Sequence, residues 1–274
     1  MTTIDLNAPP LELIDVSGYR MAYRQWGKTD QDEATLLIHG ITSSSLSWIR
    51  VAPRLAERTR VIAVDLKGHG DSARPSQGYR VRDQADEVMA LIGRLRLREV
   101  RLMGHSWGGA VSALLAANDS LPISRVVLED PAIQLGGGPP ERRQQAMQNY
   151  TGSVDLPREE TERRVRGTAA PGWTEEDIQG KIDAAVKTSR ASVQAVFDEN
   201  TGFDATDSLL QVRVPTLMVR AEVALGGIVG EPVLERLREN PRIQVVTIQR
   251  ADHNIHRGEF DAFMAVVEPF LAGA

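Results

Sequence analysis

The chain has 274 residues, of which 42% are hydrophobic and 25% are charged, and its formal net charge at pH 7 is −5. This length and composition suit one large domain with a sizeable apolar core, and the acidic balance argues against a nucleic-acid surface. The chain contains no cysteine, which excludes disulfide bonds, thiolate catalysis and cysteine-ligated metal sites.

Strands and helices are predicted to alternate through the first half of the chain. Short strand-like runs at 11–16 and 19–26 flank the hairpin signal Ser17-Gly18. Continuous apolar runs are typical of strands buried on both faces, and they occur at 34–38, 60–64, 100–103 and 124–128. Helical segments are expected between and after them, at 46–58, 81–97 and 110–117. This alternation predicts an α/β fold in which helices cover both faces of a mostly parallel sheet.

The pattern changes after Pro131. Residues 133–206 contain no convincing strand, and the sequence Gly136-Gly137-Gly138-Pro139-Pro140 is typical of a flexible hinge. Capping and proline signals predict four helices, starting at residue 139 or 140, at about 157, at 175 and at 191. We therefore expect an all-helical lid over residues 132–206.

The alternation resumes near the end of the chain. A strand is predicted at 214–220, a helix at 231–239, a strand at 243–248 and a closing helix at 259–271. The α/β core is thus expected in two parts, residues 1–131 and 207–274, on either side of the lid.

The most informative motif is Gly104-His105-Ser106-Trp107-Gly108, which follows a predicted strand and precedes a predicted helix. Strand, Gly-x-Ser-x-Gly and helix form the layout of a nucleophile elbow, a turn so tight that side chains at the two glycine positions would clash. The following helix N-terminus favours negative charge that develops near the serine. Ser106 is therefore the candidate nucleophile.

A serine nucleophile needs a base, and histidine is the usual one near neutral pH. His253 and His256 lie in the loop after the last predicted strand, from which a base can reach the serine. We favour His253, because it comes first after the strand. The spacing His253-x-x-His256-x-x-Glu259 also resembles a metal pattern, but it does not lie within a helix and lacks a further ligand, so we expect no metal.

Acyl transfer also needs hydrogen-bond donors for the oxyanion of the tetrahedral intermediate. The backbone N–H of Trp107, directly after the nucleophile, is one candidate. The second is the N–H of Ile41, where Gly40 lets the chain turn inward after the strand at 34–38.

These motifs resemble the α/β-hydrolase fold superfamily over nearly the whole chain. The resemblance is carried by His39-Gly40, the segment 65–72 (Asp-Leu-Lys-Gly-His-Gly-Asp-Ser), the serine motif with Gly109, and His253. It implies an eight-stranded, mostly parallel sheet with a helical lid after the sixth strand. Within the superfamily, the chain looks like the lidded esterases, lactonases and carbon–carbon-bond hydrolases, in which segment 65–72 is usually structural.

The third member of the catalytic triad is where the chain departs from the common pattern. Most relatives have an aspartate after the seventh strand, and here Ala224 occupies that position. In haloalkane dehalogenases and in lactonases similar to those acting on zearalenone, the acid follows the sixth strand, where this chain has Glu129-Asp130. We favour Asp130. Glu129 is the second candidate, because a shift of one residue would exchange the two side chains, and Glu222 is the third.

The expected substrate site lies between the strand ends and the lid. Its candidate wall residues are mostly apolar: Gly40, Leu46, Trp48, Ile133, Leu135, Met147, Trp173 and Ile255. Together with the triad they predict a serine hydrolase that cleaves carboxylic esters or lactones of a hydrophobic small molecule, without a cofactor.

Two alternatives remain open. One is a carbon–carbon-bond hydrolase of ring-cleavage diketones, for which Arg190 is a possible carboxylate donor. The other is a small-molecule receptor with slow or no turnover, since fold does not fix function. With no signal pattern in residues 1–13 and no apolar run of about 18 residues, we expect a cytoplasmic monomer or homodimer with no membrane partner.

Overall fold

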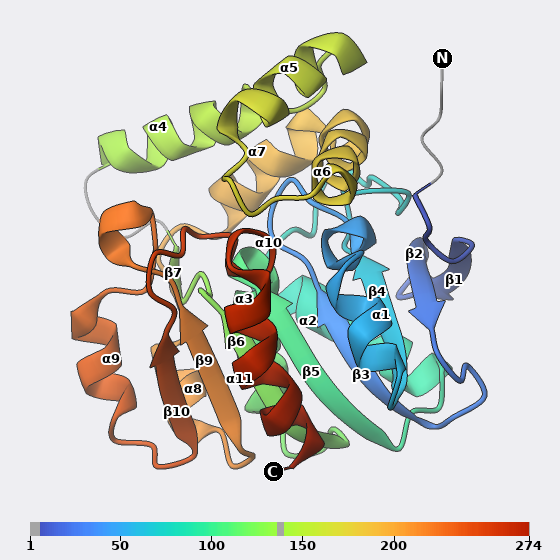
Figure 1. Ribbon diagram of the computed structural model, residues 1–274, viewed down its shortest axis with the longest axis vertical. Helices are drawn as coiled ribbons and strands as arrows, with labels where there is room; N and C mark the ends of the chain where they lie inside the picture. The colour runs from blue at the N-terminus through green and yellow to red at the C-terminus, as the bar shows by residue number, and fades with distance from the viewer. Residues whose placement is uncertain (1–5, 136–139, 274) are drawn as a thin grey trace.

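The computed structural model describes residues 6–135 and 140–273 and contains an eight-stranded sheet (Figure 1). The strands lie in the order β1-β2-β4-β3-β5-β6-β9-β10. Strand β2 is antiparallel to both of its neighbours, and all other pairs are parallel. The strands are β1 (Glu12–Val16), β2 (Tyr19–Trp26), β3 (Glu33–Ile38), β4 (Arg60–Asp65), β5 (Glu99–His105), β6 (Ile123–Glu129), β9 (Thr216–Arg220) and β10 (Ile243–Thr247). The predicted α/β-hydrolase architecture is confirmed.

Helices cover both faces of this sheet. Those of the core are α1 (Val51–Ala56), α2 (Val81–Arg94), α3 (Ser106–Ala116), α8 (Thr206–Gln211), α9 (Glu231–Leu237), α10 (Ile255–Gly258) and α11 (Phe260–Ala272). Figure 1 shows α1 and α11 in front of the sheet. The short helices α8 and α10 were not predicted, because four to six residues are too few to show a helical period.

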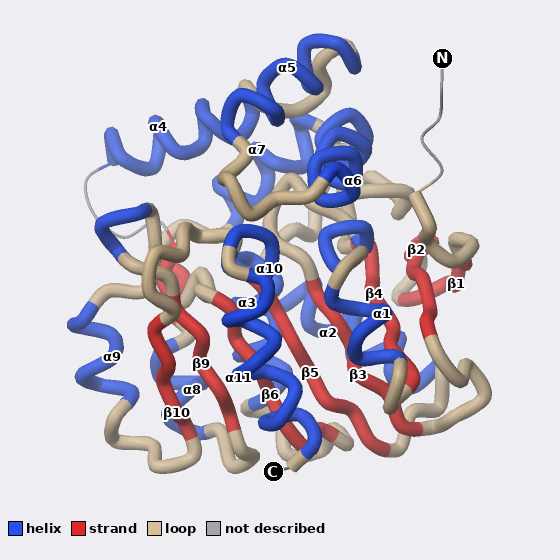
Figure 2. Tube along the Cα trace, viewed as in Figure 1, coloured by secondary structure: helices blue, strands red, loops and turns tan. Residues whose placement is uncertain are grey.

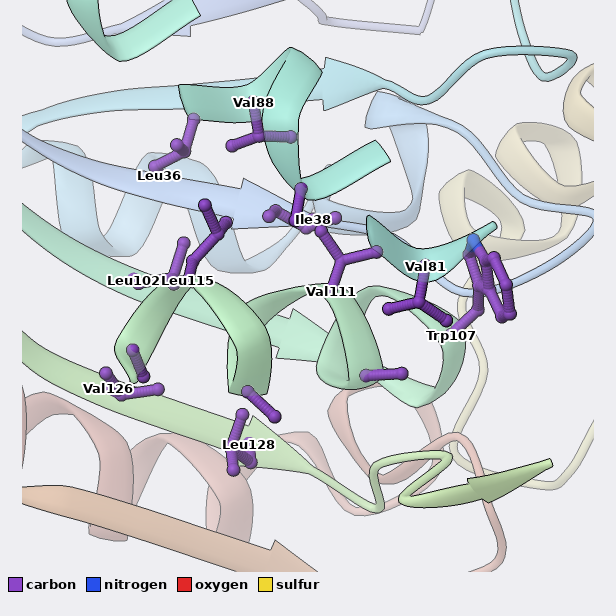
Figure 3. Packing of buried hydrophobic residues seen from close by; sticks show 14 of the residues in the cluster. Leu36, Ile38, Val81, Val88, Leu102, Trp107, Val111, Leu115, Val126 and Leu128 are labelled. Carbon is purple, nitrogen blue, oxygen red and sulfur yellow. The ribbon is translucent and has the colours of Figure 1, made fainter. Parts of the chain in front are cut away.

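Successive residues of the buried strands point into two different apolar cores. In β3, Leu36 and Ile38 belong to the core that contains residues of α2 and α3, whereas Leu37 belongs to the core that contains residues of α1 and α11. Figure 3 shows the first of these cores, in which Val111 and Leu115 of α3 lie among Leu36, Ile38 and Leu128. Both faces of the strand are apolar because both are covered, which explains the continuous apolar runs in the sequence.

Of the described helices between β6 and β9, the four that precede α8 lie above the carboxyl ends of the strands (Figure 2). They are α4 (Pro140–Thr151), α5 (Arg158–Thr168), α6 (Glu175–Lys187) and α7 (Arg190–Glu199). Thr174 caps α6, and its side chain forms a capping box with Asp177. The proposed hinge residues 136–139 lie outside the described part of the chain.

Two predictions about local structure are wrong. The helix expected over 46–58 is divided into the 3₁₀-helix η1 (Ser45–Trp48) and α1, because Pro53 has no N–H and would clash with the carbonyl of Ile49 in one continuous helix. The stretch 133–206 does contain strands: β7 (Gln134–Leu135) pairs antiparallel with β8 (Phe203–Asp204). Each is two residues long, too short to give a sequence period. None of the described helices has both the length and the apolar character that would be needed to cross a membrane.

Candidate active site

Ser106 stands on the tight turn between β5 and α3. Its φ of +52° is rare for a side chain other than glycine. A Cβ at Gly104 would lie 2.3 Å from the carbonyl oxygen of Gly108, and one at Gly108 would lie 2.2 Å from that of Ile38. No real Cβ tolerates such distances, so the two glycines of the motif are required by the close approach of the backbone.

Ser106, His253 and Asp130 form a continuous hydrogen-bonded chain. The Ser106 hydroxyl lies 2.9 Å from Nε2 of His253, and Nδ1 of the same ring lies 2.6 Å from Oδ2 of Asp130. A carboxylate can only accept, so Nδ1 carries the proton and Nε2 is left to accept one from the serine. The structure thus brings together the three residues that the sequence favoured.

Asp130 is fixed by several donors at the end of β6. Its backbone N–H still pairs with the carbonyl of Val219 in β9, and its φ of +35° turns the chain there. Oδ2 accepts from the backbone N–H of Ile228 at 3.0 Å in addition to His253. The carboxylate is fully buried, so these donors replace the water that would otherwise solvate its charge.

The two alternative acids lie elsewhere. Glu222 accepts from the backbone N–H of Arg250 at 2.8 Å and holds the loop before His253 rather than the imidazole itself. Glu129 binds the second candidate base: its Oε1 accepts from Nδ1 of His256 at 2.8 Å and from the backbone N–H of His256 at 2.9 Å. Adjacent carboxylates therefore bind different histidines.

His105, Glu129 and His256 form a buried cluster beneath this chain of hydrogen bonds. One nitrogen or oxygen of each lies within 4.8 Å of those of the other two, a spacing that a metal ion could use. However, both ring nitrogens of His256 already have partners, Glu129 and Ser47. Burial raises the pKa of Glu129 and lowers the pKa of His105 and of His256 well below the usual range.

The loop after β3 passes directly beside the serine. A Cβ at Gly40 would lie 3.1 Å from Cβ of Ser106 and 2.8 Å from Nδ1 of His105, so only glycine fits there. Among residues 6–135 and 140–273, the N–H of Ile41 has no hydrogen-bond acceptor. Trp107 is the second residue of α3, where helix N–H groups have no intrahelical partner. Both predicted oxyanion donors are therefore available.

A lysine from helix α6 holds this loop. Nζ of Lys181 donates to the carbonyl oxygen of Thr42 at 2.7 Å and to its hydroxyl at 2.9 Å. Thr42 has a φ of +57°, a strained conformation for a β-branched residue. Burial lowers the pKa of Lys181 to about 7.

A cavity of about 300 Å³ opens beside Ser106. Leu135 lines it, as expected, together with Ile41 and Trp107, whose N–H groups are the candidate oxyanion donors. Its other walls come from three regions, namely the strand ends, helices α4 and α7, and the loop after β9: Ala132, Gln134, Arg143, Ala146, Tyr150, Val196, Phe197, Asn200 and Ile228. A second hollow, of about 380 Å³, lies at the opposite ends of the strands and contains none of the candidate residues.

Several residues predicted for the pocket wall do not reach this cavity. Trp48 and Ile255 are fully buried in the core with α1 and α11, and Ile133 is buried in the other core. The remaining residues are also absent from the lining: Gly40, Leu46, Met147 and Trp173. Their apolar character reflects packing, which a sequence does not distinguish from substrate contact.

The cationic wall residue is a different arginine from the one suggested by the sequence. Arg190 is exposed and donates to the carbonyl of Val154 at 3.2 Å. Arg143 on α4 instead lines the cavity, bonded to the Thr201 hydroxyl, and no carboxylate of the described residues lies within ion-pair distance of it. Nothing in the sequence indicates that Arg143 lies at the cavity, because its place depends on how α4 lies over the strand ends.

A family model described as "Alpha/beta hydrolase family" matches residues 35–266. The chain belongs to this family. An uncharacterised protein of Mycobacterium tuberculosis is 39% identical over 124 residues, 45% of this chain, and the match spans 36% of that relative's length. N-formylmaleamate deformylase of Pseudomonas putida is 28% identical over 264 residues, which cover 94% of this chain and 95% of the deformylase.

Solved structures show the same fold. E-2-(acetamidomethylene)succinate hydrolase has a TM-score of 0.82 at 24% identity, covering 96% of this chain and 99% of the other. The enol-lactonase of Burkholderia xenovorans has a TM-score of 0.78 at 20% identity, covering 95% of this chain and all of the other, 100%. At these identities the likeness concerns the architecture, not the substrate.

Proposed function

We propose that this α/β-hydrolase family member is a serine hydrolase that cleaves carboxylic esters or lactones through an acyl-enzyme intermediate. The observation that carries the proposal is the hydrogen-bonded chain from Asp130 through His253 to Ser106, with distances of 2.6 and 2.9 Å. Nucleophile, base and orienting acid in this order are the parts that serine catalysis needs.

In the proposed reaction, Ser106 Oγ attacks the substrate carbonyl carbon while its proton passes to Nε2 of His253. The N–H groups of Ile41 and Trp107 stabilise the oxyanion of the tetrahedral intermediate. His253 then gives its proton to the departing alkoxide, leaving an acyl ester on Ser106. A water molecule, deprotonated by His253, attacks this ester, and the collapse of the second intermediate releases the acid and returns the proton to Ser106.

The walls of the cavity support a small, mainly apolar substrate. Leu135, Val196, Phe197 and Ile228 line it, and its volume of about 300 Å³ lies at the lower end of typical ligand pockets. Because α4 and α7 supply part of the wall, we propose that residues 132–206 act as a lid. A lactone is one possible substrate class in this proposal, since an enol-lactonase shares this fold.

A second candidate is hydrolysis of a substrate that carries a free carboxylate, and Arg143 favours it. A guanidinium that lines an apolar cavity without a carboxylate partner among the described residues suits an anionic group of a ligand. N-formylmaleamate and 2-(acetamidomethylene)succinate, named for two similar proteins, are carboxylates whose hydrolysis also breaks an acyl bond. The ring-cleavage diketones considered above share this feature.

A fluorophosphonate probe tests the proposed nucleophile. We expect the folded protein to gain one adduct, on Ser106, and Ser106→Ala to gain none. Absence of the adduct in the folded native protein would refute serine catalysis. An adduct without turnover of any ester, lactone or amide substrate would favour a receptor.

The two substrate classes can be separated with matched esters. A nitrophenyl ester of a neutral acyl chain is compared with one whose chain ends in a carboxylate. If Arg143 binds substrate carboxylate, Arg143→Ala should lower kcat/KM for the anionic ester by roughly 10- to 100-fold, as for a lost charged hydrogen bond, and leave the neutral ester within about threefold. Equal effects on both esters would rule out carboxylate recognition by Arg143.

A further inference from the structure

Two adjacent residues at the end of β6 each bind a histidine of the same short segment, residues 253–256. Asp130 binds His253, and Glu129 binds His256. The mechanism proposed above uses the first pair and assigns no role to the second, although Glu129 and the His256 side chain are buried to 99% or more.

The cluster of His105, Glu129 and His256 holds segment 253–256 at both ends. At the first end, Nε2–H of His105 donates to the carbonyl oxygen of His253 at 2.9 Å. At the other, Oε1 of Glu129 accepts both the backbone N–H and Nδ1–H of His256. Hydrogen bonds to His105 and Glu129 thus fix the backbone that carries the imidazole of His253.

Other buried groups keep His256 in place. The Ser47 hydroxyl donates to its Nε2 at 3.1 Å, and the Arg257 guanidinium donates to the same Ser47 oxygen at 2.8 Å. The ring centroids of Trp48 and His256 are 4.8 Å apart. Both ring nitrogens of His256 are bonded and Trp48 lies beside the ring. These contacts fix the ring in the orientation in which Nδ1 faces Glu129.

Neither Glu129 nor His256 lines the cavity beside Ser106. Their effect on a substrate must therefore pass through His253. We propose that Glu129 is a positioning residue for His253, acting through His256 and segment 253–256; this inference rests on the serine mechanism proposed above.

The geometry of the reaction makes small displacements matter. The hydroxyl of Ser106 and Nε2 of His253 are 2.9 Å apart, and a shift of about 1 Å at a reacting group lowers rates by about 100-fold. Shortening Glu129 by one methylene group moves its carboxylate by about 1.5 Å. His256 and the backbone that leads to His253 would have to follow or lose both bonds.

Two substitutions separate position from charge. Glu129→Gln keeps an oxygen at the same place for the two N–H groups of His256 but removes the charge. Glu129→Asp keeps the charge but displaces it. If Glu129 acts by positioning, Glu129→Gln should retain kcat within about threefold, whereas Glu129→Asp should lower kcat by about 30- to 100-fold with KM within about twofold. The rate of fluorophosphonate labelling of Ser106 should follow kcat.

Glu87 provides a matched control. It is also a buried carboxylate, bonded to Tyr19 at 2.9 Å and paired with Lys67, but it lies on α2 outside the site. Glu87→Gln and Glu87→Asp should both leave kcat within about twofold of the native value. A general loss of stability would lower kcat in variants of both residues. A loss of positioning would lower kcat only in the Glu129 variant whose carboxylate is displaced.

Other results would overturn the inference. A larger loss in Glu129→Gln than in Glu129→Asp would show that the charge matters, and native kcat in both variants would show no role. If Glu129→Asp does not fold, His256→Asn and His256→Ala test the same link, because the Asn amide nitrogen can replace Nδ1; equal kcat in these two variants would refute it. Failure of native protein to label at Ser106 refutes the serine mechanism itself, so the two failures are distinguishable.

Discussion

The two carboxylate–histidine pairs at the end of β6 have the same chemistry and opposite surroundings. In the pair of Asp130 and His253, the histidine side chain is 19% exposed and its Nε2 faces Ser106. In the pair of Glu129 and His256, the histidine side chain is 1% exposed and its Nε2 faces the buried hydroxyl of Ser47. Both carboxylates are fully buried, so burial of the acid does not separate the two pairs.

What separates them is the group at the second ring nitrogen and the space around it. Ser106 opens on a cavity that a substrate can enter, whereas Ser47 lies inside the protein, bonded to Arg257. Under the proposed function, a serine–histidine–carboxylate sequence of hydrogen bonds would therefore not be sufficient for catalysis. Ser106 has the nucleophile elbow, the oxyanion donors and an adjoining cavity, and Ser47 beside the pair of Glu129 and His256 has none of these among the described residues.

The largest effect that tests this comparison is expected for Asp130→Asn. An amide at this position can donate to Nδ1 of His253, which stabilises the wrong tautomer and leaves a proton on Nε2 where the base must accept one. We expect kcat to fall by about 10,000-fold, the size of loss known for such a change in a serine triad, with KM little altered. Steady-state kinetics on an activated ester measure it.

The same substitution in the other pair is the natural control. Glu129→Gln should remain within about threefold of the native kcat, because the buried pair has only to hold its histidine. Comparable losses in Asp130→Asn and Glu129→Gln would contradict the distinction drawn between the two pairs.

The sequence alone predicted the three residues of the hydrogen-bonded chain but not the surroundings of that chain. Ser106 could be predicted because a tight turn requires glycines at two fixed positions, and Asp130 because the resemblance to relatives with an acid after the sixth strand implied it. The role of Glu129 could not be predicted: alternation along the strand suggested that only one of two adjacent carboxylates would face the histidine loop. Asp130 instead leaves the strand geometry with a φ of +35°, and both carboxylates bind histidines of that loop. The cavity walls were also poorly predicted, because they depend on how α4 and α7 lie over the sheet.

The pair of Glu129 and His256 should also affect how the free energy of unfolding depends on pH. Burial holds the pKa of His256 well below 6.5, so below pH 6.5 the unfolded chain binds a proton there that the folded protein does not. This contribution to the free energy of unfolding is therefore lost as the pH falls, by about 1.4 kcal/mol per pH unit.

The measurement compares native protein with His256→Asn by urea denaturation at pH 6.5, 6.0 and 5.5. Asn has no proton to bind in this range, so the native protein should lose stability relative to the variant as the pH falls. The comparison at each pH removes the effects of His39, His69 and His105, which both proteins share. A difference between the two proteins that is independent of pH would mean that His256 takes up its proton in the folded state.

The smallest effect is expected at the third candidate acid. Glu222 accepts from the backbone N–H of Arg250, three residues before His253, and makes no bond to either histidine. Glu222→Gln keeps an accepting oxygen, so kcat should stay within about twofold, and the free energy of unfolding should fall by less than about 1 kcal/mol. A loss of kcat as large as that of Asp130→Asn would mean that the triad acid follows β9 when substrate is bound, and the assignment of Asp130 would fail. Because Glu222 lies on the loop next to His253, its near-native activity would show that contact with this loop alone does not make a carboxylate important for the rate.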